Sequence, residues 1–193
     1  MPSAMKILPT RLPEVLLFEP EVRRDARGYF VETWRANWLA EAGIEADFVQ
    51  ENQSASRRGV LRGLHFQWPQ EQGKLVRVVR GKVFDVAVDV RRGSPTFGAW
   101  TGTELDDDAH RQLWIPPGFA HGFCVLSEEA VVVYRCTAYY APQAEAGIRW
   151  DDPELGIAWP RTDVPFTLSP KDAAQPRLAE LAPERLPVYR GAA

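Results

Sequence analysis

The chain has 193 residues, 45% of them hydrophobic, and a formal net charge of −3 from 26 acidic and 23 basic side chains. This size fits one domain, expected to span residues 1–193, and the slightly acidic charge predicts no nucleic-acid partner. No apolar run reaches the length of a membrane span, and the first residues lack a signal-peptide pattern, so we expect a cytoplasmic protein without a membrane partner. Cys124 and Cys136 lie in apolar stretches without C-x-x-C spacing, which favours reduced, buried thiols.

Alternating apolar and polar residues predict β-strands along most of the chain. The first half is expected to hold strands near residues 15–18 and 30–33, a helix over R-A-N-W-L-A-E-A-G-I that Gly43 ends, and a strand over 59–67. The second half is expected to hold further strands at L-V-R-V-V-R, K-V-F-D-V-A-V-D-V, 100–105, 112–115 and A-V-V-V-Y-R-C-T. The segment from Leu178 onward is rich in Pro, Glu and Arg and is expected to be peripheral.

Two of these strands have clear faces. In K-V-F-D-V-A-V-D-V the alternation separates Phe84, Val86, Val88 and Val90 from Asp85, Ala87 and Asp89. In A-V-V-V-Y-R-C-T, Val132, Tyr134 and Cys136 share a face that we expect to point into the interior. Many short strands with little helix between them predict an all-β sandwich or barrel.

The stretch W-I-P-P-G-F-A-H-G-F contains P-x-G-x-x-H and resembles the second signature of the cupin proteins. The resemblance implies an all-β, cupin-like double-stranded β-helix, or jelly roll, with a few short peripheral helices. Metal-binding cupins add a first signature with H-x-H, but L-H-F-Q supplies only His65, and His110 lies in a hydrophilic turn. With His121 this leaves two candidate histidine ligands, fewer than a typical catalytic metal site uses, so we expect no metal.

Two longer blocks make the resemblance specific. G-V-L-R-G-L-H-F-Q with Q-G-K-L-V-R-V, and R-Q-L-W-I-P-P-G-F-A-H-G-F with V-Y-R-C-T and Y-Y-A-P, resemble the active-site blocks of the dTDP-4-dehydrorhamnose 3,5-epimerase family. R-G-Y-F-V-E-T, V-Q-E-N-Q-S, G-I-R-W-D-D-P and S-P-K-D-A resemble further pieces, from about Phe18 to Pro176. The resemblance implies an isomerase that converts dTDP-4-dehydro-6-deoxyglucose into dTDP-4-dehydrorhamnose, in rhamnose-type deoxysugar biosynthesis.

Such a reaction removes a proton beside the C4 ketone, stabilises an enolate and returns a proton on the opposite face, without a cofactor. Histidine titrates near neutral pH, so His65 is the expected base, and by resemblance Asp172 is its partner. The resemblance further implies Tyr134 as the acid, Lys74 as the enolate stabiliser and His121 as a wall of the sugar pocket. On residue type alone, each has an ordinary alternative as a core, turn or surface residue.

The nucleotide end of the substrate calls for cations at the pyrophosphate and polar contacts around them. The residues that match the family here are the cations Arg27, Arg62 and Lys171 and the polar residues Glu32, Gln50, Glu51, Asn52 and Glu145. The family is dimeric with N-terminal strands that cross between subunits, so the resemblance also implies a homodimer in which Arg27 and Glu32 serve the neighbour's site. Ala138 and the pair Gln143-Ala144 depart from the family pattern in a loop, which bears on substrate preference.

Three alternatives stay open at this point. A relative with the same pattern could invert only C3 or only C5 of a related dTDP-keto sugar. A metal-dependent cupin enzyme would need ligands beyond the two histidines. A non-catalytic cupin that binds sugar nucleotides would not need the combination of His65, Tyr134 and Asp172.

Overall fold

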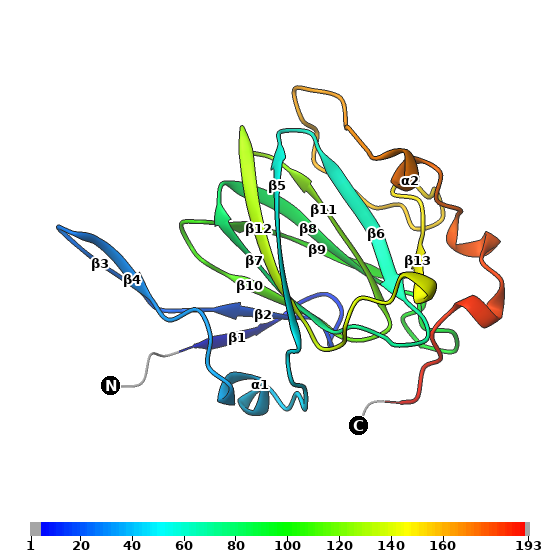
Figure 1. Ribbon diagram of the computed structural model, residues 1–193, viewed down its shortest axis with the longest axis horizontal. Helices are drawn as coiled ribbons and strands as arrows, with labels where there is room; N and C mark the ends of the chain where they lie inside the picture. The colour runs from blue at the N-terminus through cyan, green and yellow to red at the C-terminus, as the bar shows by residue number, and fades with distance from the viewer. Residues whose placement is uncertain (1–4, 192–193) are drawn as a thin grey trace.

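The structure is a computed structural model that describes residues 5–191. Two antiparallel sheets face each other, and a third, two-stranded sheet projects from them as an arm (Figure 1). The six-stranded sheet has the order β1 (Lys6–Pro9), β2 (Leu16–Glu19), β10 (Gln112–Ile115), β7 (Lys74–Arg80), β12 (Glu129–Cys136), β5 (Gln50–Arg57). The five-stranded sheet has the order β13 (Glu145–Gly147), β6 (Leu61–Gln67), β11 (Phe119–Val125), β8 (Lys82–Asp89), β9 (Trp100–Asp106).

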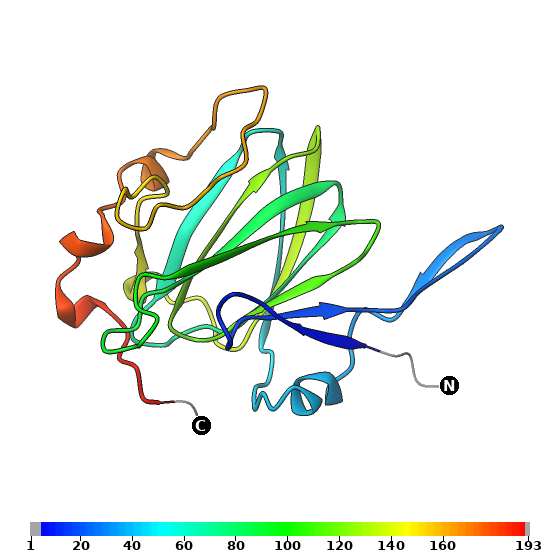
Figure 2. The same cartoon turned by 180° about the vertical axis from the view of Figure 1, so that it is seen from behind.

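The remaining elements are short. The arm is the hairpin β3 (Val22–Asp25) and β4 (Gly28–Val31), and it points away from both sheets in the two opposite views (Figures 1 and 2). The helices are α1 (Asn37–Glu41) and α2 (Pro170–Ala173), with the 3-10 turns η1 (Pro142–Ala144), η2 (Leu178–Glu180) and η3 (Pro183–Arg185). None of the helices within residues 5–191 has the length and apolar character needed to cross a membrane.

Three apolar clusters hold these layers together, because both faces of each sheet are covered. The central cluster lies between the sheets and includes Val83 and Ala87 from β8 and Val132 from β12. A second cluster covers the outer face of the five-stranded sheet and includes Val86 of β8 and Leu178 of the C-terminal segment. The third packs α1 and its flanks on the outer face of the six-stranded sheet.

The faces predicted from alternation are confirmed. Val86, Val88 and Val90 lie in the outer cluster, Ala87 lies in the central one, and Val132 and Tyr134 point inward together. The predicted helix is confirmed as the shorter α1, with Gly43 after its end at a φ of +72°. The strand expected at 30–33 is instead β4, which begins two residues earlier, where the hairpin turn places Gly28. The two cysteines are free and buried, as expected.

Two glycines allow β6 and β11 to approach closely beside the future site. A Cβ on Gly63, whose φ is +117°, would lie 2.6 Å from the Gly122 Cα, and a Cβ on Gly122 would lie 2.6 Å from the Arg62 carbonyl oxygen. The register of the two strands shifts between His121 and Phe123 at this point. The R-G-L and H-G-F motifs are therefore backbone requirements that place His65 directly opposite His121.

Candidate active site

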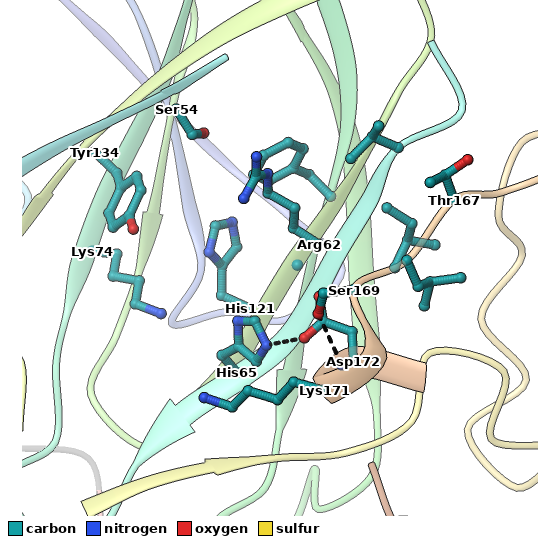
Figure 3. A pocket seen from close by; sticks show the side chains of 15 residues that line it. Ser54, Arg62, His65, Lys74, His121, Tyr134, Thr167, Ser169, Lys171 and Asp172 are labelled. Carbon is teal, nitrogen blue, oxygen red and sulfur yellow. Dashed lines mark hydrogen bonds and ion pairs between the residues drawn. The ribbon is translucent and has the colours of Figure 1, made fainter. Parts of the chain in front are cut away.

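A cavity opens between the two sheets, and Figure 3 shows the side chains that point into it. It has two lobes, with volumes of about 450 and 420 Å³, within the range of small-molecule sites. Five residues line both lobes and mark their junction: Ser54, Arg62, His65, Lys74 and Tyr134. The first lobe continues to Phe123 and Leu168, and the second, more polar, continues to Gln50 and Glu145.

His65 and Asp172 form the contact that sequence could only imply. The His65 Nε2 lies 2.6 Å from the Asp172 Oδ1, across 107 residues of sequence (Figure 3). Burial raises the pKa of the Asp172 carboxyl, but hydrogen bonds from His65, the Gly63 N–H and Ser169 outweigh it and lower the pKa. A carboxylate only accepts, so Nε2 donates, and Nδ1 is left with the lone pair of a base.

His121 forms a second histidine–carboxylate pair. Its Nε2 lies 3.0 Å from both oxygens of Asp85, a residue with no exposed surface. Asp85 is on the inward face of β8, opposite Phe123 of β11. The pair fixes the His121 ring in the cavity wall next to His65, its register partner.

Tyr134 reaches the cavity from the other sheet. It lies on β12, opposite Asn52 of β5, and its ring centroid is 6.5 Å from that of His121. Burial raises the pKa of its phenol. The hydroxyl therefore stays protonated at neutral pH, which suits an acid.

Lys74 lies at the start of β7, opposite Cys136, with only 7% of its surface exposed. Within residues 5–191 its amine forms no hydrogen bond or ion pair, and it points into the cavity (Figure 3). Burial is the larger effect and lowers the pKa of the amine, while Cys136, Asp85 and Glu145 act in the opposite direction. A buried cation without a partner is costly, so the site is prepared for an anion.

The two halves of the chemistry thus come from opposite walls. His65 and His121 belong to the five-stranded sheet, and Lys74 and Tyr134 belong to the six-stranded sheet. A ring bound between them would have the His65 imidazole at one face and the Tyr134 phenol at the other. This arrangement suits removal and return of a proton on opposite faces.

Comparison with known proteins agrees with this geometry. Residues 9–180 match the family model described as dTDP-4-dehydrorhamnose 3,5-epimerase. The chain belongs to the dTDP-4-dehydrorhamnose 3,5-epimerase family. The isomerase class, the epimerase function in dTDP-rhamnose biosynthesis and the cupin-like fold expected from sequence are confirmed.

Three similar proteins carry this result. The dTDP-4-dehydrorhamnose 3,5-epimerase of Neisseria gonorrhoeae is 57% identical over 170 residues, 88% of this chain, and the chain spans only 52% of that relative. The protein of the same name from Pseudomonas aeruginosa is 56% identical over 169 residues, 87% of this chain and 93% of its own length. The crystal structure of dTDP-6-deoxy-D-glucose-3,5-epimerase from Legionella pneumophila, in complex with dTDP-4-keto-L-rhamnose, has a TM-score of 0.94 and 50% identity, and covers 97% of this chain and 100% of that chain.

The eight residues that the family resemblance assigned to the nucleotide divide into two groups. Arg62, Lys171 and Glu145 lie at the cavity, where the Lys171 amine pairs with Glu145. Gln50 and Asn52 line the polar lobe and are joined by a 3.0 Å hydrogen bond. The epimerase-family cavity therefore holds five of the eight residues expected at the nucleotide end.

The other three lie outside the cavity of their own chain. Arg27 is at the tip of the arm, with 89% of its side chain exposed and Asp25 as its partner. Glu32 follows the arm and pairs with Arg35. Glu51 points to the opposite face of β5 from Gln50 and Asn52, and pairs with Arg135.

Sequence reasoning missed several residues of this epimerase-family site, and three of them support its geometry. Asp85 could have been found as a carboxylate on the inward face of an apolar strand. Ser169 accepts a hydrogen bond from the Asp172 N–H and so caps α2, in the S-P-K-D sequence that is typical of a helix start. Gln67, two residues after His65, gave no signal because all its partners are backbone groups, and the two in the loop of residues 137–141 are distant in sequence.

The donor set also bears on metals. In the part of the chain that the structure describes, no three His, Cys, Asp or Glu side chains come together as a candidate metal site. Both cavity histidines already pair with a carboxylate through Nε2. The absence of a metal requirement stays a prediction.

Replacing Lys74 by methionine should separate stability from activity. The variant removes a buried charge without a partner, so we expect the free energy of unfolding at pH 7 to rise by about 1 kcal/mol. The same variant should lose about 100-fold or more in turnover, because the enolate loses its cation. Urea unfolding and a turnover assay measure the two effects.

The matched control is Lys82→Met, which removes an exposed lysine paired with Glu104. That change should alter the free energy of unfolding by less than about 0.5 kcal/mol. A Lys74→Met variant less stable than the natural protein would contradict the view that the site holds its cation at a cost.

Proposed function

We propose that this chain inverts C3 and C5 of dTDP-4-dehydro-6-deoxyglucose to give dTDP-4-dehydrorhamnose. The observation that supports the assignment of roles is that His65 on one sheet faces Tyr134 on the other, with Lys74 on the same sheet as Tyr134. Both carbons flank the same ketone, so one base, one acid and one enolate stabiliser can serve two successive inversions.

Each inversion has two proton transfers. The His65 Nδ1 takes the proton α to the C4 ketone, and the electrons of the broken C–H bond form the enolate. Asp172 stabilises the resulting imidazolium, as its short hydrogen bond to Nε2 favours. The Lys74 ammonium stabilises the enolate oxygen, and the Tyr134 hydroxyl delivers a proton to the opposite face of the carbon.

The sequence of steps moves only protons, so the proposed reaction needs no redox cofactor and no metal. The phenolate left on Tyr134 and the imidazolium left on His65 return to their starting forms by proton exchange with water. His65 has access for this exchange, because 31% of its side chain is exposed. The resting site is thereby restored after each inversion.

The polar lobe is the proposed place of the nucleoside diphosphate. Arg62 lies at the junction of the lobes, and Lys171, at the start of α2, lines the first lobe and pairs with Glu145 of the polar lobe. Both cations are suited to pyrophosphate, and Arg62 offers the planar fork that phosphate groups favour. The ligand of the Legionella pneumophila relative, dTDP-4-keto-L-rhamnose, contains such a nucleoside diphosphate.

A homodimer is the proposed assembly, in which the arm completes the neighbour's site. The arm carries Arg27 away from its own cavity and exposes Tyr29 and Phe30, with 54% and 67% of their surfaces accessible. Large exposed aromatics on a projecting hairpin favour burial against another chain. Arg27 would then supply a further cation to the partner's pyrophosphate.

Turnover in heavy water tests the reaction. The natural protein should place deuterium at both carbons beside the ketone of dTDP-4-keto-6-deoxyglucose, as followed by NMR. A folded His65→Ala variant should lose about 1,000-fold in exchange, because the base is missing. Deuterium at a single carbon would instead identify a mono-epimerase, and natural protein that binds dTDP without any exchange would be a binding module.

Mixing two impaired variants tests the dimer. Arg27→Ala and His65→Ala protomers, refolded together at equal amounts, form heterodimers with one site that has both residues. At low substrate concentration about a quarter of the natural activity should return. If each arm serves its own cavity, or the protein is a monomer, mixing restores nothing.

A further inference from the structure

Three glutamine side chains hold the loop of residues 137–141, which connects β12 to η1. Gln67 bonds to the loop at two places: its Oε1 accepts from the Ala141 N–H at 2.9 Å, and its Nε2 donates to the Tyr139 carbonyl at 3.3 Å. Gln72 donates to the Ala138 carbonyl at 2.8 Å, and Gln50 accepts from the Tyr140 N–H at 2.9 Å. Each bond is to the backbone, so the glutamines fix the path of the loop whatever its side chains are.

Gln67 differs from the other two because it is buried and both N–H groups of its side-chain amide are used. Only 4% of its surface is exposed, and its Nε2 also donates to the Gln70 carbonyl at 2.8 Å. It lies two residues after His65 on β6, and its backbone is paired with Glu145 of β13. The strand that carries the proposed base therefore also carries the buried side chain that bonds to the loop at two places.

The loop in turn presents Tyr140 to the polar lobe. The Tyr140 hydroxyl donates to the Glu145 Oε2 at 2.7 Å, and the same oxygen pairs with the Lys171 amine. Lys171 precedes Asp172, which bonds to His65. A closed chain of contacts thus runs from His65 through Asp172, α2, Glu145 and the loop to Gln67, and along β6 back to His65.

We propose that Gln67 is a positioning residue that holds Tyr140 and Glu145 in place for the nucleoside diphosphate, and so sets the affinity of the polar lobe. The proposal rests on the function proposed above for that lobe. Without Gln67, the Ala141 N–H and the Tyr139 carbonyl lose their partner, and the loop samples several paths. Binding the nucleotide must then order the loop, and this weakens binding without touching the His65–Asp172 pair.

The variant Gln67→Met keeps the length of the side chain and removes every hydrogen bond it makes. We expect the Kd for dTDP, measured by titration calorimetry, to rise about tenfold. The KM for the dTDP-keto sugar should rise by a similar factor, while kcat, measured as deuterium exchange at saturating substrate, should stay within about twofold. Gln67→Glu retains the acceptor for the Ala141 N–H and should bind dTDP with intermediate affinity.

The matched control is Gln143→Leu, which removes an exposed glutamine from the adjoining η1 and should bind dTDP as the natural protein does. If Gln67→Met does not fold, Gln72→Met loses one bond to the same loop and should raise the Kd about threefold. Unchanged dTDP binding in a Gln67 variant, or a fall in kcat without a change in KM, overturns the proposal. If the natural protein binds dTDP but exchanges no deuterium, the proposed function is wrong, and the effect of Gln67 on dTDP binding is still tested.

Discussion

The hydrogen bond between His65 and Asp172 joins two parts of the chain that are far apart in the sequence and that the fold brings together. β6 supplies the imidazole from within a sheet, whereas α2 belongs to the irregular C-terminal segment that covers the outer face of that sheet (Figure 2). The buried side chains of Leu178 and Leu186 attach that segment to the sheet, and the Ser169 cap fixes the start of α2. The apolar contacts that look purely structural therefore determine whether the proposed base has its partner. Loosening the segment would leave His65 without the bond that sets its tautomer.

The same site places polar and charged side chains where apolar ones would make the fold more stable. The central cluster fills the space between the sheets with Val, Leu, Ile and Phe, but the cavity interrupts it with Lys74, Asp85 and His121. Asp85 and His121 satisfy each other, whereas the Lys74 amine has no partner among the described residues. An apolar side chain would pack there at lower free energy. A buried amine at this place suits the role proposed for Lys74, the stabilisation of an enolate oxygen.

The sequence was informative where a side chain's neighbours are local or periodic. The alternation in β8 and β12 predicted which residues point inward, and the motifs around His65 and His121 indicated the family. β5 was not predicted, because Q-E-N-Q-S-A-S-R is polar except for Ala55 and only its burial alternates. β11 was not predicted, because every residue in it is buried, and Gly122 within it and Gly118 just before it are typical of a turn. The Asp85–His121 pair and the Gln67 bonds depend on strand register between distant segments, which no local pattern encodes.

Exchange without inversion in Tyr134→Phe tests most directly whether the two sheets act on opposite faces of the sugar. In this variant His65 can still remove the α proton, exchange it with heavy water and return deuterium to the same face. The account predicts substrate that gains deuterium beside the ketone while keeping its configuration, with inversion slowed by about 100-fold or more. Inversion at the natural rate would contradict it. So would the loss of both exchange and inversion in a variant that still has His65 and Asp172 in place.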